Sequence, residues 1–281
     1  MKKRLLLIVM ILAIAVTTVI GIAACNEDAI VVYTNAYFAP FEYMQNQEIV
    51  GVDVDIMNKV GEKLGKKVKF VNTDFAMVIP TVAEGKLCDA GAAGITVTDE
   101  RKEKVDFSIE YYTSVQYVIY KVGSFDTATA NDGNTVIYWD KLAGKKIGVQ
   151  LDTTGNIYVA GEIAKDDGFD GVLFESGAEC KPYDDAMLAS SALKSGQIDC
   201  VVVDELPAKY IVNSSNSAYA CAALYYDADS ATEEQYAIAV TKGNTELLNA
   251  INEVLTEMLV KDAEGKTQID KLVSKHFGLN G

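Results

Sequence analysis

The sequence is short of histidine and of cysteine, and both shortages narrow what the protein can do. A single histidine, His276, in 281 residues argues against a histidine-based catalytic triad and against a multi-histidine metal site. Four cysteines follow Cys25, and their spacings match no zinc signature. No Walker-type glycine loop occurs, so the chain lacks the usual means of holding ATP. We therefore expect neither a metal nor a cofactor.

Basic residues are also scarce. The sequence has 25 lysines and arginines and 40 aspartates and glutamates, which gives a net charge of −15. Three of the basic residues, Lys2, Lys3 and Arg4, precede an apolar run, and without them the charge is −18. A chain this acidic is repelled by phosphate backbones and by anionic lipid surfaces. The charge excludes nucleic acid as a natural partner, and any contact with a membrane must come from a lipid.

The first 24 residues are typical of an export signal. The apolar run Leu5–Ala24 is long enough to span a bilayer, so an uncleaved signal anchor is one interpretation. However, the run ends in small residues followed by Cys25, which resembles the lipobox of bacterial lipoproteins. We expect residues 1–24 to be removed and Cys25 to be diacylated. Residues 25–29 then form a lipidated N-terminus and spacer on the outer face of the cytoplasmic membrane.

Cys88, Cys180, Cys200 and Cys221 remain after the signal segment. Cys88 and Cys200 occur among small apolar residues at strand edges, so free thiols are the simplest interpretation. An exported protein can also pair two cysteines. If it does so here, the first pair to expect is Cys180 with Cys221.

Strands and helices alternate along the chain in two similar sets, which predicts α/β structure with mainly parallel sheets. Glycine-closed helix ends before residues 89–91 and 200–202 give the two sets a common pattern and suit two similar lobes. A polar stretch at 124–136 predicts a surface loop between the sets, and two amphipathic helices end the chain. The expected strands lie at 30–33, 68–71, 89–95, 145–149, 172–174 and 200–203. The expected helices lie at 54–64, 77–84, 155–164, 184–193, 247–259 and 269–273.

Ligands of open α/β sheets bind where strands end and helices begin. The residues at those positions here have complementary chemistry, and they are Asn35, Phe38, Phe75, Thr96, Arg101, Thr153, Thr154 and Asp204. Arginine can hold a carboxylate with two parallel hydrogen bonds, and aspartate can hold an ammonium. Together they predict a clamp for the zwitterion of an α-amino acid.

Each of these residues also has a purely structural interpretation. Arg101 lies in a charged run that is typical of a solvated helix face, and Asp204 can cap the turn before Pro207. Phe38 and Phe75 can be core residues. The ligand-site interpretation depends on all of them following successive strands.

From Ile30 to Phe277 the chain resembles the polar amino-acid family of substrate-binding proteins that supply bacterial ABC importers. The motifs that carry this resemblance are TNAYFAPFEY (34–43), GVDVDI (51–56), DFAMVIP (74–80), GITVTDER (94–101), VDFS (105–108), LAGKKIGVQ (142–150) and KHFG (275–278). The resemblance implies the type II periplasmic-binding-protein fold, in which two lobes are joined by two hinge strands, here near 112–116 and 233–237. The expected divisions are 30–113 for lobe 1, 114–234 for lobe 2, and 235–281 for the return to lobe 1.

The resemblance also implies a role for each candidate residue. Arg101 takes the ligand carboxylate, and Thr154 completes that site from the second lobe. Gly94 and Thr96 add backbone and hydroxyl contacts. Asp204 takes the α-ammonium. Phe38 and Phe75 sandwich the side chain of the ligand, and Asn35 is at a position that commonly faces that side chain.

Two positions depart from the family's pattern. The family often has aspartate where this chain has Asn35, and an amide there removes a counter-charge for lysine or arginine. Asp152 stands where glycine is usual, so it either tilts the loop or repels acidic ligands. We therefore expect an uncharged polar amino acid, such as glutamine.

The function that these features predict is capture of a polar amino acid outside the cytoplasmic membrane. The protein, which the resemblance implies is a monomer, then delivers it by cleft closure to an ABC permease and its ATPase. One alternative is a sensing module that reports the ligand to a membrane receptor. Another is a dehydratase on the same fold, for which Asp152 and Asp204 are the acid–base candidates.

Overall fold

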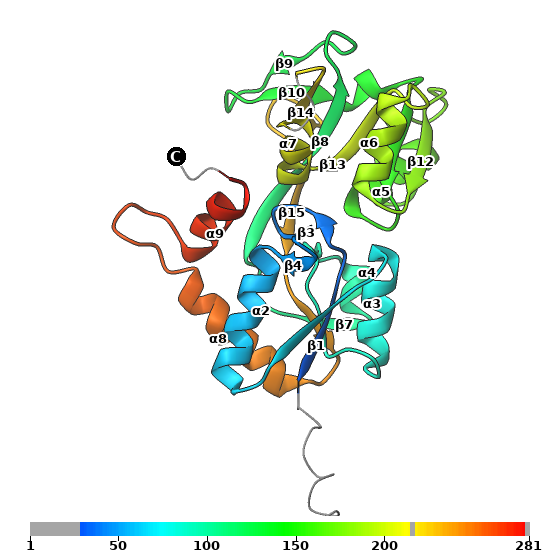
Figure 1. Cartoon of the computed structure of the whole chain (residues 1–281). Helices are drawn as coiled ribbons and strands as arrows, with labels where there is room; N and C mark the ends of the chain where they lie inside the picture. The colour runs from blue at the N-terminus through cyan, green and yellow to red at the C-terminus, as the bar shows by residue number, and fades with distance from the viewer. Residues whose placement is uncertain (1–28, 214–216, 279–281) are drawn as a thin grey trace, which may run out of the picture.

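The computed structural model describes residues 29–213 and 217–278, which form two lobes one above the other (Figure 1). The predicted signal peptide and the lipidation site at Cys25 lie outside these residues. Within them, no helix is long and apolar enough to cross a membrane.

Lobe 1 is built on a five-stranded sheet in the order β5-β1-β6-β16-β7. Strand β1 is parallel to its neighbours β5 and β6, whereas β16 runs antiparallel to β6 and β7. A separate small sheet, β2-β3-β4, follows β1. The strand bounds are β1 Ile30–Thr34, β2 Tyr37–Phe38, β3 Glu42–Gln45, β4 Glu48–Val50, β5 Val68–Asn72, β6 Ala90–Gly91, β7 Val105–Phe107 and β16 Ala239–Thr241.

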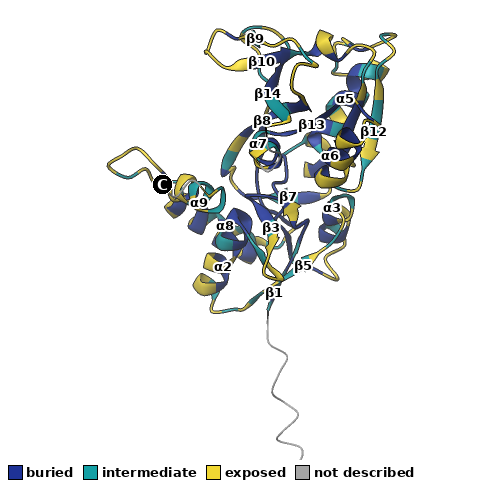
Figure 2. Cartoon of the chain, turned by 45° about the horizontal axis from the view of Figure 1, so that its top comes forward, coloured by how far each residue is buried: buried dark blue, intermediate teal, exposed yellow. Residues whose placement is uncertain are grey.

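Lobe 1 has five helices, and the buried apolar faces of the longer ones form its core (Figure 2). Along α2, residues Val52, Ile56, Met57 and Val60 are fully buried at the spacing of one helix face, and α8 packs beside α2. Leu247, Ile251 and Leu255 of α8 belong to the same apolar cluster. The helix bounds are α2 Val52–Leu64, α3 Phe75–Glu84, α4 Asp99–Lys102, α8 Thr245–Met258 and α9 Gln268–His276.

Lobe 2 is built on a larger mixed sheet in the order β12-β11-β13-β8-β14-β10-β9. β11 is parallel to β12 and β13, and β8 is antiparallel to β13 and β14. The strand bounds are β8 Tyr112–Lys121, β9 Ala128–Thr129, β10 Thr135–Tyr138, β11 Lys146–Gln150, β12 Glu179–Tyr183, β13 Cys200–Asp204 and β14 Tyr219–Tyr225. The helices are α5 Thr154–Ala164, α6 Ala186–Lys194 and α7 Glu205–Asn213, with the 3-10 helix η1 at Trp139–Leu142.

Two strands connect the lobes, as Figure 1 shows for β8 and for β15 (Glu233–Tyr236). They pair in antiparallel register from Tyr112 opposite Tyr236 to Val115 opposite Glu233. The second half of β8 then continues as a central strand of lobe 2. The expected hinge positions at 112–116 and 233–237 therefore coincide with this paired ribbon.

Two expectations about lobe 2 are wrong. The apolar segment 172–174 is a turn in which only Leu173 is buried, while Val172 and Phe174 are largely exposed. The strand in that region is β12, whose sequence ECKPY is too polar to predict a strand. It tolerates Pro182 because it lies at the edge of the sheet, where one side makes no ladder hydrogen bonds.

The pairing of Cys180 with Cys221 is also wrong. All four described cysteines are free thiols. Cys180 lies in β12 and Cys221 in β14, four strand positions apart in the same sheet, which is about 19 Å at the usual strand spacing. A disulfide requires Cα atoms within roughly 7 Å.

The single histidine is a packing residue that ties the last helix to lobe 1. Nε2 of His276 lies 2.9 Å from Oδ2 of Asp55 in α2, and Nδ1 lies 3.3 Å from the hydroxyl of Tyr43. Lys275 contacts the same Asp55 oxygen at 2.9 Å. Partial burial alone would raise the pKa of Asp55, but the hydrogen bonds from His276 and Lys275 outweigh it and lower that pKa below its usual value.

This arrangement predicts a pH-dependent loss of stability on replacing Asp55. A carboxyl with a lowered folded pKa stabilises the fold above the unfolded value near ~3.9, and the stabilisation disappears as the pH falls through the folded value. Asp55→Asn should cost about 1 kcal/mol at pH 7, since the pair is partly screened by water, and nothing near pH 2. Denaturant unfolding at both values measures the difference. Glu110→Gln is the control, because that exposed side chain has no ion pair among the described residues; an equal loss at both pH values would contradict the assignment.

Candidate ligand-binding site

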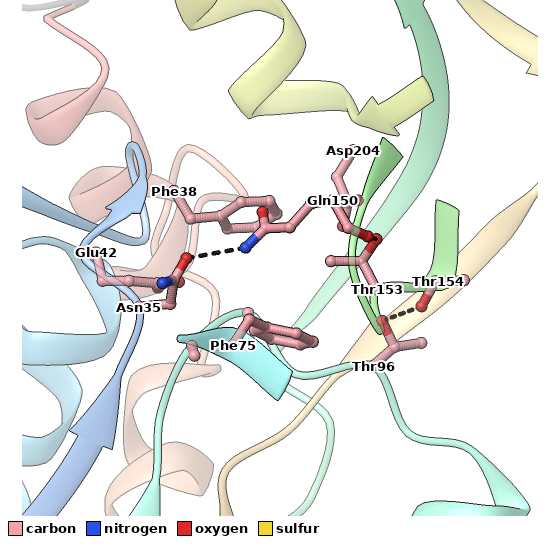
Figure 3. A pocket seen from close by; sticks show the side chains of 11 residues that line it. Asn35, Phe38, Glu42, Phe75, Thr96, Gln150, Thr153, Thr154 and Asp204 are labelled. Atoms are coloured by element: carbon pink, nitrogen blue, oxygen red, sulfur yellow. Dashed lines mark hydrogen bonds between the residues drawn. The ribbon is translucent and has the colours of Figure 1, made fainter. Parts of the chain in front are cut away.

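A small cavity lies between the two lobes, where strand ends and helix starts from both sides meet (Figure 3). Its free volume of about 10 Å³ is roughly what one water molecule needs, so the lobes close directly on each other. Its lining residues are Asn35, Phe38, Glu42, Phe75, Ala93, Gly94, Thr96, Gln150, Thr153, Thr154 and Asp204.

The chain reaches this cavity at the carboxyl ends of its sheet strands. Asn35 directly follows β1, whereas Gln150 and Asp204 are the last residues of β11 and β13. Phe75 and Thr154 are the first residues of α3 and α5. The N-terminus of a helix carries partial positive charge, so the start of α5 favours a negatively charged ligand group. Eight predicted residues thus line one cavity: Asn35, Phe38, Phe75, Gly94, Thr96, Thr153, Thr154 and Asp204.

Gly94 has two structural reasons to be glycine. Its φ of +52° lies in the left-handed region, and a Cβ atom there would lie 2.8 Å from the ring of Phe38. Its amide donates a 2.9 Å hydrogen bond to Oδ2 of the buried Asp53, and Tyr111 donates to Oδ1 of the same carboxyl. The amide of Gly94 is thereby occupied inside lobe 1.

Asp53 is fully buried beneath the cavity. Burial raises its pKa to about 6, although the hydrogen bonds from Tyr111 and Gly94 act in the opposite direction. The carboxyl therefore holds the loop at Gly94 next to the side chain of Tyr111.

Side chains from the two lobes bond directly across the cavity. Thr154 donates to the hydroxyl of Thr96 at 2.7 Å, and Gln150 donates from Nε2 to Oδ1 of Asn35 at 3.0 Å (Figure 3). These two contacts come from opposite ends of the cavity. They use polar groups of both lobes that a ligand would have to engage.

Arg101 is the one predicted site residue that does not line this cavity. Its guanidinium lies in the adjoining hollow with Asp152 and Phe75, and its Cζ atom stands 5.4 Å from the centre of the Phe75 ring. Nη1 donates to the carbonyl of Thr96 at 2.8 Å, and Nη2 donates across the lobes to the carbonyl of Asp152 at 2.7 Å. Arg101 therefore lies behind Thr96, which lines the cavity, and it joins the lobes by hydrogen bonds to one backbone oxygen of each.

The structure also explains the unusual Asp152. Its φ of +60° is left-handed, a conformation that glycine adopts freely and that aspartate tolerates better than most residues. The side chain is exposed and lies outside the cavity wall. Asp152 contributes its backbone carbonyl, which accepts a hydrogen bond from Arg101. The expected repulsion of acidic ligands by its side chain is not supported by a contact with the cavity.

Several polar residues at the site were not predicted from the sequence. Glu42 lines the cavity, is fully buried, and accepts no hydrogen bond from the described residues. Gln116, Glu234 and Tyr236 come from the hinge strands and surround Asp204 beneath the cavity. The sequence signal for Glu42 was its place next to Phe41 in the otherwise uncharged stretch 34–47, whereas Gln116, Glu234 and Tyr236 had no such signal.

Asp204 is held by neutral donors. Nε2 of Gln116 donates to Oδ1 at 2.8 Å, and the hydroxyl of Tyr236 donates to Oδ2. Burial raises the pKa of Asp204, and the hydrogen bonds from its neighbours partly oppose that rise. No group of three or more histidine, cysteine, aspartate or glutamate side chains in the described chain has the arrangement to hold a metal ion.

Two hinged α/β lobes with a polar, aromatic-walled cavity between them define a solute-binding protein. In agreement, residues 30–278 match the model of the bacterial extracellular solute-binding proteins, family 3, and the chain belongs to that family. The two-lobed fold expected from the sequence is confirmed by this match and by the solved structures described next. The family binds solutes and is not a family of enzymes, which removes the dehydratase alternative.

Relatives with known names or structures cover most of the chain. The arginine-binding extracellular protein ArtP of Bacillus subtilis (strain 168) is 26% identical over 281 residues, covering 99% of this chain and 98% of that protein. A solved ancestral arginine-binding protein, bound to arginine, is 34% identical with a TM-score of 0.70, covering 89% of this chain and 97% of that one. The same ancestral protein bound to glutamine superposes with a TM-score of 0.70 and 34% identity, covering 89% and 98%.

The fit of Gly94 against Phe38 predicts an unequal pair of alanine substitutions. Gly65 also has a left-handed φ, +66°, but an added Cβ would meet nothing within 4 Å. Gly65→Ala should cost about 1–2 kcal/mol of unfolding free energy through backbone conformation alone. Gly94→Ala should cost roughly 1–3 kcal/mol more, because the methyl group also overlaps the Phe38 ring. Equal losses in denaturant unfolding would show that the ring moves aside freely.

Proposed function

We propose that this protein captures a polar α-amino acid outside the cytoplasmic membrane and delivers it to an ABC permease by closing its two lobes. The observation that carries the proposal is that one cavity joins a helix N-terminus and Thr96 to the buried acid Asp204. These groups suit the two charges of a zwitterion. The names of the relatives support the chemical class, since they bind arginine, cystine and, in one solved complex, glutamine.

Arg101 completes the proposed carboxylate end. Its guanidinium stands behind Thr96 and already carries hydrogen bonds to two backbone oxygens, one from each lobe. When the lobes part, the bond to the Asp152 carbonyl is broken and Nη2 is released. A ligand carboxylate then replaces that carbonyl oxygen with a charged acceptor, and a charge-assisted hydrogen bond is about twice as strong as a neutral one.

The opposite end of the cavity supports glutamine as the ligand. Asn35 and Gln150 meet there as an amide pair, and each amide presents both a donor and an acceptor. A glutamine side chain offers the same complementary groups and can replace the bond between them. Neither amide supplies the counter-charge that lysine or arginine would need.

Glu42 favours a second candidate, a cationic amino acid such as arginine. Burial, together with the nearby Asp53 and Asp204, raises the pKa of Glu42 well above its usual value. A buried carboxyl that accepts no hydrogen bond from the described residues is stabilised when a guanidinium reaches it. The aromatic pair Phe38 and Phe75 suits either candidate, since a guanidinium stacks on aromatic faces and an amide packs against them.

We also propose how the protein is exported, anchored and divided into lobes. Residues 1–24 are the signal peptide, and Cys25 carries the lipid anchor that keeps a monomer at the outer face of the cytoplasmic membrane. Residues 30–113 and 235–281 form lobe 1, and residues 114–234 form lobe 2. The chain belongs to an extracellular solute-binding family, and its charge without residues 1–24 is −18. Both observations support this location. The alternative partner is a membrane receptor that recognises the closed lobes.

A thermal-shift screen of residues 26–281 against the common amino acids tests the function and distinguishes the two ligands. A ligand at 100 times its dissociation constant adds about 2.7 kcal/mol of stability. We expect glutamine to stabilise the wild type and Glu42→Gln alike. If arginine is the ligand, Glu42→Gln should lose most of the arginine shift and keep any glutamine shift. Absence of a shift with every amino acid would refute the proposed function.

Replacing Arg101 tests the carboxylate end separately. Arg101→Ala leaves the ligand carboxylate without its cation, a loss of the order of 2–5 kcal/mol in binding. Calorimetry should then show affinity lowered at least thirtyfold. Lys102→Ala is the control, because that exposed neighbour pairs only with Asp99 on the surface. Near-normal affinity in Arg101→Ala would remove Arg101 from the site.

A further inference from the structure

Asp204 belongs to a pair of buried acids. Glu234 of the hinge strand β15 is 2% exposed, and Asp204 is 4% exposed. A single nitrogen, Nε2 of Gln116 in β8, donates to both carboxyls, at 2.8 Å to Asp204 and at 2.6 Å to Glu234. The other oxygens of the pair accept from the hydroxyls of Tyr236 and Thr96. The two carboxyls therefore lie side by side, held only by neutral donors.

Nearby charge does not balance this pair. Arg101 is the cation that acts on both carboxyls, but its hydrogen bonds go to backbone carbonyls, and neither acid has a salt bridge in the described chain. A third buried acid, Glu42, lines the same cavity without accepting a hydrogen bond. The titratable groups that face the pair are Glu42, Arg101, Tyr112, Tyr158 and Tyr236.

Two ionised carboxylates this close and this buried repel each other strongly, so such a pair shares a proton. Burial raises the pKa of both, and the charge of Asp204 raises that of Glu234 further. Asp204 faces the cavity, so a cation that enters there meets the pair directly. The cavity-facing Glu42 and the unpartnered Oε1 of the buried Gln116 show that the surrounding polar groups are also incompletely satisfied.

We propose that Glu234 is the second carboxylate of the ammonium end of the cavity, and that the proton shared by Asp204 and Glu234 leaves when the ligand's ammonium binds. The inference rests on the proposed function. The balance is simple: one carboxyl gives up H⁺ to the solvent, the ammonium keeps its three hydrogens, and no bond to carbon changes. Glu234 is a positioning residue that acts through Asp204 and Gln116.

The sign of the pH dependence follows from this exchange. The ligand-free protein holds one more proton than the complex, so ligand affinity rises with pH. The rise approaches tenfold per pH unit while the pair is protonated, and it levels off once the pH exceeds the raised pKa. An amino-acid site without such a pair has nearly constant affinity between about pH 5.5 and 7.5, where the ligand's own groups keep their charges.

Calorimetry of residues 26–281 with L-glutamine and L-arginine as probes tests the proton release. Titrations at one pH in phosphate and in Tris differ in heat by the number of protons released, because the two buffers have different ionisation enthalpies. We expect the wild type to release close to one proton per ligand. Glu234→Gln should release far less, and its affinity should vary much less between pH 5.5 and 7.5.

Two variants separate this result from other sources of protons. Glu233→Gln changes an exposed glutamate on the same strand and should release as many protons as the wild type. Glu42→Gln, titrated with L-glutamine only, shows whether the third cavity acid is the source instead: if the Asp204–Glu234 pair is the source, the protons released per bound glutamine do not fall. Binding without buffer-dependent heat in the wild type would overturn the inference and leave the proposed function standing. Undiminished release in Glu234→Gln would also overturn it, whereas failure of every amino acid to bind would refute the function itself.

Discussion

The antiparallel pairing of β8 with β15 is the interaction on which the rest of the structure depends. It is the ribbon that joins the lobes, and it supports the cavity through Asp204, which lines the cavity wall. Gln116 and Tyr236, one from each strand, hold Asp204 from below. The backbone of residues 95–97 bonds to the same ribbon, since Val97 donates to Gln235 and Ala237 donates to Ile95. Hinge and binding site are therefore one set of hydrogen bonds, so a change in one is felt in the other.

Much of this arrangement could be predicted from the sequence because apolar periodicity and glycine-closed helix ends are local signals. The helix at 52–64 and the strand at 200–204 follow from their buried faces. The same signals failed for β12, whose Glu179 and Lys181 face solvent at a sheet edge and leave no apolar alternation. The opposite error occurred at 172–174, where a strand was expected. The short apolar segment around the buried Leu173 has the sequence pattern of a strand, although it forms a turn.

The site was predictable in part for a related reason. Eight of the nine candidate ligand residues line the cavity, and most of them follow a strand or begin a helix, positions that topology alone brings together. Arg101 was expected in the cavity wall, but its guanidinium lies in the adjoining hollow. The direction of a long side chain depends on its hydrogen-bond acceptors, here the carbonyls of Thr96 and Asp152, and no sequence pattern reveals them. Glu234 was missed since its partners are 30 and 118 residues away, and its role depends on contacts, not on spacing.

The turn at Asp152 has a consequence for how firmly the lobes hold each other. Its carbonyl occupies Arg101, so the protein's own backbone imitates the negative end of a solute. A solute carboxylate must therefore compete with a neutral oxygen for one guanidinium. The exchange favours the solute because a charged acceptor forms the stronger hydrogen bond, and the gain is the difference between two bonds, not the whole of one.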